Sequence, residues 1–201
     1  EIPATQNGWQ LLRTNASLPM TLSSSMPWQI GFINIERPGR GVTVSAMGIN
    51  GAQLSQWSKW RPGMWEDLAQ TKADLIILAY GTNEAFSGNL DISSTERTWR
   101  NYIRQIKNTL PNAGILILGA PESLKTAYGS CGNRPVLLSE VQQMQQRVAR
   151  DEKIMFWSWQ DAMGGACSMK NWMAQGLAAK DGVHFSAQGY ETAADKLADS
   201  L

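Results

Sequence analysis

The chain has 201 residues, 43% of them hydrophobic and 17% charged, which is enough apolar material for the core of one ordinary globular domain. Its 18 lysines and arginines against 17 aspartates and glutamates give a net charge of +1. That balance offers no basic surface for nucleic acid or an anionic membrane. No apolar run approaches the roughly 18 residues of a membrane-spanning helix. The opening Glu1-Ile2-Pro3 is neither a signal peptide nor a start methionine, so we expect that a segment upstream has been removed.

Residues 1–41 differ in character from the rest of the chain. They contain short apolar stretches, such as Gly8–Leu12 and Trp28–Ile35, separated by prolines, serines and glycines. This pattern predicts short strands and turns without helical periodicity. We therefore expect 1–41 to be an all-β piece, distinct from residues 42–201.

From residue 42 onward, strand and helix patterns alternate. The predicted strands are Val42–Gly48, Asp74–Tyr80, Gly114–Leu118 and Lys153–Trp159. The predicted helices lie between and after them: Gln53–Gln70 with an interruption at Pro62-Gly63, a helix starting at the capping box Ser93–Glu96 and ending before Pro111, one starting at Ser139, and one capped by Ser186. Apolar strands alternating with helices predict an α/β fold, with a parallel sheet covered on both faces.

Three loops at the carboxyl ends of these strands carry residues suited to acyl transfer, and ligands of such sheets bind at these ends. The only histidine, His184, follows Asp181 by three residues. That carboxylate can accept a hydrogen bond from Nδ1, which leaves Nε2 to take a proton from a hydroxyl nucleophile. The Asn83 side chain and the Gly51 backbone N–H can donate to an oxyanion. Each loop alone could be an ordinary turn, but three together favour a catalytic site.

These loops resemble the sequence blocks of the SGNH (GDSL-type) hydrolases, esterases with a three-layer α/β/α flavodoxin-like fold. Gly48–Gly51 resembles the second block, Gly81–Glu84 the third and Asp181–His184 the fifth. The resemblance spans Val42–Leu201. It implies that the fifth block supplies the aspartate and histidine of a catalytic triad, and that the other two supply the oxyanion hole.

Two longer stretches, Gly48–Trp65 and Leu75–Phe86, are similar to the bacterial peptidoglycan O-acetylesterases of the cell envelope. The resemblance implies removal of acetyl from the 6-hydroxyl of N-acetylmuramic acid, with no metal or organic cofactor, in the periplasm or elsewhere in the envelope. Those enzymes carry a carbohydrate-binding-like β-sandwich inserted between the first and second blocks. Residues 1–41 would be the tail of that insert. A disulfide between Cys131 and Cys167 would suit such an oxidising compartment, although the sequence leaves their pairing open.

One block is missing, because no Gly-Asp-Ser occurs in the chain. We assign none of the serines present as nucleophile. We expect an amino-terminal fragment of the same polypeptide to supply Gly-Asp-Ser together with the first strand, which belongs in the middle of the sheet. Two alternatives stay open: another SGNH esterase acting on other acyl or carbohydrate esters, and a non-catalytic glycan-binding protein that kept the fold.

Overall fold

The computed structural model describes residues 12–31, 33–37 and 39–201, and it divides the chain into two units. The division falls between Met47 and Gly48, shortly after the boundary expected from the sequence. The described residues up to Met47 form neither helix nor strand. The apolar stretch Gly8–Leu12 lies outside the described residues except for Leu12.

The strands expected at 28–35 and at 42–48 are therefore not seen in the described residues, and these predictions were wrong. Val42 and Val44 are 91% and 86% exposed. A strand forms only where a neighbouring strand takes up its backbone hydrogen bonds. No described strand pairs with either segment, so β propensity alone does not produce a strand there.

The second unit contains all the helices and strands of the described chain. In order they are η1 (Leu54–Lys59), α1 (Met64–Thr71), β1 (Leu75–Leu78), α2 (Thr82–Phe86), α3 (Ile92–Thr109), β2 (Gly114–Leu118), α4 (Leu138–Glu152), β3 (Met155–Trp157), α5 (Trp159–Met163), α6 (Met169–Ala174) and α7 (Ala187–Ala198). The three strands are parallel and lie in the order β1-β2-β3. Leu75 pairs with Gly114, and Leu116 pairs with Met155. The predicted parallel α/β sheet is confirmed.

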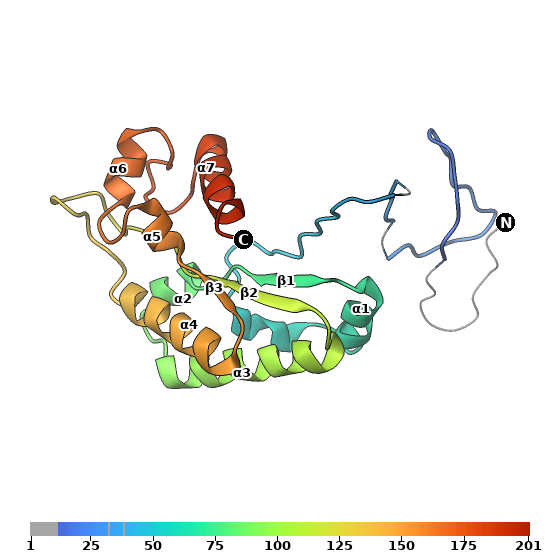
Figure 1. The fold of residues 1–201 in the computed structure, drawn as a ribbon, viewed down its shortest axis with the longest axis horizontal. Helices are drawn as coiled ribbons and strands as arrows, with labels where there is room; N and C mark the ends of the chain where they lie inside the picture. The colour runs from blue at the N-terminus through green and yellow to red at the C-terminus, as the bar shows by residue number, and fades with distance from the viewer. Residues whose placement is uncertain (1–11, 32, 38) are drawn as a thin grey trace. The chain divides into compact units, whose positions relative to one another are not determined.

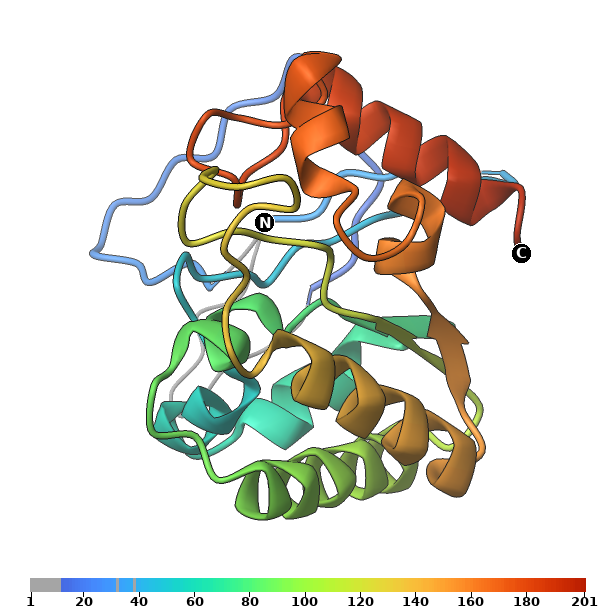
Figure 2. The same ribbon diagram turned by 90° about the vertical axis from the view of Figure 1, so that its left-hand side faces the viewer.

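Helices lie on both faces of this sheet (Figures 1 and 2). Helices α3 and α4 cover one face, and apolar residues at helical spacing are fully buried there: Trp99, Ile103, Ile106, Val141, Met144 and Val148. Helix α7 lies on the other side with α5 and α6 (Figure 1), where Met169, Trp172 and Phe185 belong to a second apolar cluster. The result is the three-layer arrangement expected from the sequence.

Local signals account for several helix boundaries. Ser186 caps α7 as predicted, since its Oγ accepts the Gly189 N–H at 3.1 Å. Helix α3 instead begins after Asp91, whose Oδ1 accepts the N–H groups of Ser93 and Ser94, so the predicted capping box was placed too late. The interruption near Pro62 separates η1 from α1 as expected. The short helices α2, α5 and α6 were not predicted.

Candidate active site

Asp181 and His184 form a hydrogen-bonded pair in the loop before α7. His184 Nδ1 lies 2.8 Å from Asp181 Oδ2. The other carboxylate oxygen accepts the backbone N–H groups of Val183 at 2.8 Å and His184 at 3.0 Å. The His184 backbone and side-chain hydrogen bonds, with that of Val183, lower the pKa of Asp181 from 3.8 to about 2. An ionised carboxylate is thus fixed against Nδ1, while the imidazole side chain is 73% exposed.

Asn83 and Gly51 lie on two loops that contact each other. Asn83 Nδ2 donates to the Ala52 carbonyl at 2.9 Å, and Gln53 Nε2 donates to the Asn83 carbonyl at 3.2 Å. Gly51 sits in a turn closed by the Ala52 N–H and the Ile49 carbonyl, and its φ of +76° favours glycine. One Asn83 amide hydrogen and the Gly51 N–H make no hydrogen bond within the described residues, so both can serve an oxyanion.

The neighbouring Glu84 is buried, with 1% of its surface exposed. Its Oε1 accepts the Leu54 N–H and its Oε2 accepts the Gly81 N–H, both at 2.9 Å. Burial raises the pKa of Glu84, and the backbone hydrogen bonds oppose that rise. Its bonds are those of a group that fixes the two loops relative to each other.

Gln145 of α4 ties the carboxyl ends of β1 and β2 together. It is fully buried; its Oε1 accepts the Ala120 N–H at 2.8 Å and its Nε2 donates to the Tyr80 carbonyl at 2.7 Å. Gly81 passes so close that a Cβ there would lie 2.7 Å from Gln145 Nε2. Sequence reasoning missed this residue. The available signal was a polar side chain one turn after Val141, inside the apolar stripe of α4.

The loop after β2 connects the Asp181–His184 pair with the loops that carry Gly51 and Asn83. No direct hydrogen bond within the described residues joins Asp181 or His184 to the Gly51 and Asn83 loops. The loop after β2 contacts both sides, because Gln145 holds its first residues and the Leu124 N–H donates to the Gly182 carbonyl at 2.8 Å. The predicted site residues therefore lie on loops that are connected by the buried side chains of Gln145 and Glu84 and by the Leu124–Gly182 backbone bond.

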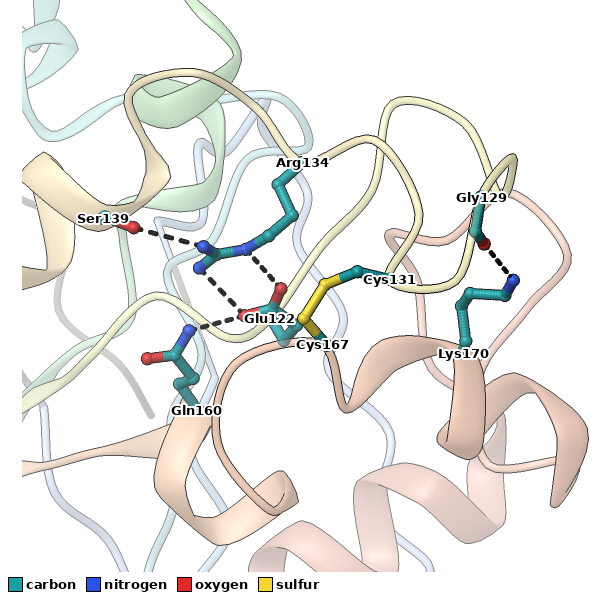
Figure 3. The surroundings of a disulfide bond; sticks show 8 residues. All are labelled: Glu122, Gly129, Cys131, Arg134, Ser139, Gln160, Cys167 and Lys170. Carbon is teal, nitrogen blue, oxygen red and sulfur yellow. Dashed lines mark hydrogen bonds and ion pairs between the residues drawn. A yellow bond between two sulfur atoms is a disulfide. The ribbon is translucent and has the colours of Figure 1, made fainter.

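A buried ion pair and a disulfide brace this linking loop (Figure 3). Glu122 is fully buried and receives Arg134 on both carboxylate oxygens, at 2.5 and 3.1 Å, while Gln160 Nε2 donates to Oε2 at 2.5 Å. Cys131 and Cys167 are bonded, with Cα atoms 4.8 Å apart. The open question about the cysteines is thus answered. The bond joins the loop after β2 to the segment between α5 and α6.

The described residues also contain a polar pocket apart from the predicted site residues. A polar pocket of about 150 Å³ at the ends of β2 and β3 is lined by α4, β3 and α5, and none of the four predicted site residues lines it. Within residues 12–31, 33–37 and 39–201, no cluster of three or more histidine, cysteine, aspartate or glutamate side chains could hold a metal ion. Over the same residues, every helix is too short or too polar to cross a membrane.

A parallel sheet with helices on both faces, and with a hydrogen-bonded Asp–His pair beyond its strands, is the architecture of an SGNH-type α/β hydrolase. Residues 24–192 match the GDSL-like Lipase/Acylhydrolase family. The chain belongs to this family. A comparison with curated proteins found no match.

Solved structures resemble the chain at two levels. A structure described as "Peptidoglycan O-acetylesterase in action" is 70% identical, with a TM-score of 0.77 over 78% of this chain and 45% of that one. The matched region thus spans less than half of that protein. An acetyl xylan esterase (16% identity, TM-score 0.60, 77% of this chain and 78% of that one) and a lipase/acylhydrolase from Enterococcus faecalis (16%, 0.53, 74% and 70%) share the fold.

Proposed function

We propose that this chain provides the acid–base and oxyanion groups of a serine esterase that removes O-acetyl groups from peptidoglycan N-acetylmuramic acid. The observation that carries the proposal is the Asp181–His184 pair, held at 2.8 Å in a chain 70% identical to a peptidoglycan O-acetylesterase. Residues 42–201 would form the hydrolase domain and residues 1–41 the tail of an inserted β-sandwich. The other SGNH esterases are too distant in sequence to favour another substrate.

The mechanism needs a serine, and we infer that it comes from a Gly-Asp-Ser segment outside these 201 residues. The open side of the sheet supports this inference. β1 pairs only with β2 among the described strands, and its Leu75 and Ile77 are 38% and 46% exposed. In the flavodoxin-like strand order 2-1-3-4-5, the missing strand would be strand 1, residues 42–48 would be strand 2 and β1 would be strand 3. The missing strand would therefore lie between β1 and residues 42–48. If it were inserted there, the missing strand would form backbone hydrogen bonds with β1 on one side and with residues 42–48 on the other. Residues 42–48 would then have a partner with which to form a strand.

In the first half of the reaction, the serine hydroxyl attacks the acetyl carbonyl while His184 Nε2 takes its proton. Asp181 keeps the other imidazole proton on Nδ1 and stabilises the imidazolium. The carbonyl oxygen becomes an oxyanion that accepts hydrogen bonds from Asn83 Nδ2, the Gly51 N–H and the serine's own N–H. Collapse expels the muramic 6-hydroxyl oxygen, which takes the proton from His184.

In the second half, water attacks the acetyl-serine, and His184 again accepts and returns a proton. The products are free serine and acetic acid, which ionises to acetate and a proton, so atoms and charge balance without a cofactor. Acting on peptidoglycan would place the enzyme in the periplasm or elsewhere in the cell envelope, where the disulfide would persist.

The test is acetate release from O-acetylated peptidoglycan by this chain combined with the Gly-Asp-Ser segment. We expect release by the wild type and a loss of about 10³-fold or more with His184→Ala. Release of acetate from acetylated xylan but not from peptidoglycan would support another SGNH esterase. Glycan binding without any acetate release would support a non-catalytic binder.

A further inference from the structure

Glu84 is buried between the two loops that carry Gly51 and Asn83. Its Oε1 accepts the Leu54 N–H from one loop and its Oε2 accepts the Gly81 N–H from the other, both at 2.9 Å, and its own backbone N–H also interacts with the carboxylate. Only 1% of the residue is exposed. It makes no ion pair within the described residues, so these backbone groups are what stabilise its charge.

The other bonds between the same loops are exposed to water. Asn83 Nδ2 reaches the Ala52 carbonyl and Gln53 Nε2 reaches the Asn83 carbonyl, both in exposed surroundings. Hydrogen bonds to a buried carboxylate are shorter and roughly twice as strong as bonds between neutral groups. The spacing of the loops therefore depends most on Glu84.

The contacts require a carboxylate of this length. Glutamine has one acceptor oxygen, so its NH₂ group would face one of the two N–H groups. Aspartate keeps both oxygens, but it is one methylene shorter and cannot span the two amides without movement of a loop. Either change leaves a buried N–H without a partner, which is costly.

We propose that Glu84 is a positioning residue of the oxyanion hole, whose carboxylate holds the Gly51 N–H and the Asn83 side chain at the spacing that binds the acetyl oxyanion. This inference rests on the proposed function. Glu84 touches no reacting atom, and its effect passes through the two loops.

The first test measures amide hydrogen exchange in the chain combined with the Gly-Asp-Ser segment, and it needs no activity. In Glu84→Gln, we expect the amide hydrogen of Leu54 or of Gly81, whichever faces the new NH₂ group, to exchange at least tenfold faster, with exchange in β2 unchanged. Glu152→Gln is the matched control, because it also replaces a buried carboxylate, one bonded to Arg104 at the far end of α4. The control should leave both amides protected. Unchanged exchange in Glu84→Gln would overturn the proposal.

The second test measures acetyl-ester hydrolysis by the chain combined with the Gly-Asp-Ser segment. We expect Glu84→Gln and Glu84→Asp to lower kcat by about 10- to 100-fold with KM within about twofold, less than the loss on removing a donor itself. Glu152→Gln should keep the wild-type kcat. Wild-type kcat in Glu84→Asp would refute the two-loop contact. An inactive wild type would refute the proposed function instead, while the exchange result would still judge Glu84.

Discussion

Replacing Asp181 by asparagine changes one atom of the candidate acid–base pair. Oδ1 of Asp181 accepts two backbone N–H groups, from Val183 and His184, so the asparagine oxygen must stay there. The new NH₂ group then faces His184 Nδ1 in place of the carboxylate oxygen now 2.8 Å away. An NH₂ group can only donate, so the neutral imidazole must accept on Nδ1 and carry its proton on Nε2, where it cannot act as a base.

The expected loss follows from this tautomer exchange. The same carboxylate-to-amide change in a serine protease triad lowers kcat by about 10⁴-fold. Because a tenfold rate change corresponds to about 1.36 kcal/mol, the substitution removes about 5.5 kcal/mol of transition-state stabilisation. The free energy of unfolding should change by only about 1 kcal/mol, because both backbone bonds are kept.

Two assays measure the change of the His184 tautomer and the loss of kcat separately. Nitrogen-15 NMR of this chain reports the tautomer without ambiguity, since His184 is the only histidine. We expect the neutral ring proton on Nδ1 in the wild type and on Nε2 in Asp181→Asn. Hydrolysis of an acetyl ester by the chain with the Gly-Asp-Ser segment then measures kcat. If the ring proton has moved to Nε2 and kcat still lies within threefold of the wild type, the tautomer does not control the rate and the prediction is wrong.

Four further results are expected. Asn83→Ala should lower kcat about 10²–10³-fold with little change in KM, and an unchanged kcat would exclude Asn83 as an oxyanion donor. The lowered pKa of Asp181 stabilises the fold above pH 3.8, so the gap in unfolding free energy between wild type and Asp181→Asn should shrink as pH falls from 3.8 to about 2. Glu152→Gln, which removes the negative charge that faces Arg104, should cost about 1–2 kcal/mol in denaturant titrations. Cys131→Ser opens a bridge between residues 36 apart and should cost about 2–4 kcal/mol; an unchanged melting temperature would contradict it.

The sequence predicted best the elements whose pattern is local. The apolar run at β2 and the stripe of Trp99 on α3 mark structures that any α/β sheet would bury, and both were found. The Asp181–His184 spacing also needed only local geometry, since three residues of one loop bring the two side chains together.

The features that the sequence did not predict depend on contacts between residues that are far apart in the chain. Gln145 acts between strand ends 25 and 65 residues away, and its role is invisible in its own helix. The segment 42–48 has strand composition but no described partner, so its propensity was not realised. Glu84 is a further case, since its carboxylate accepts the backbone N–H of Leu54 in η1, 30 residues earlier in the chain.

The proposed mechanism requires that Asp181 and His184 activate a serine supplied from outside these residues. A fluorophosphonate probe reacts with such a serine, and mass spectrometry of the labelled complex identifies the residue. We expect a single label on the serine of the Gly-Asp-Ser segment, abolished by His184→Ala. A label on any serine of these 201 residues, or labelling that persists without His184, would contradict it.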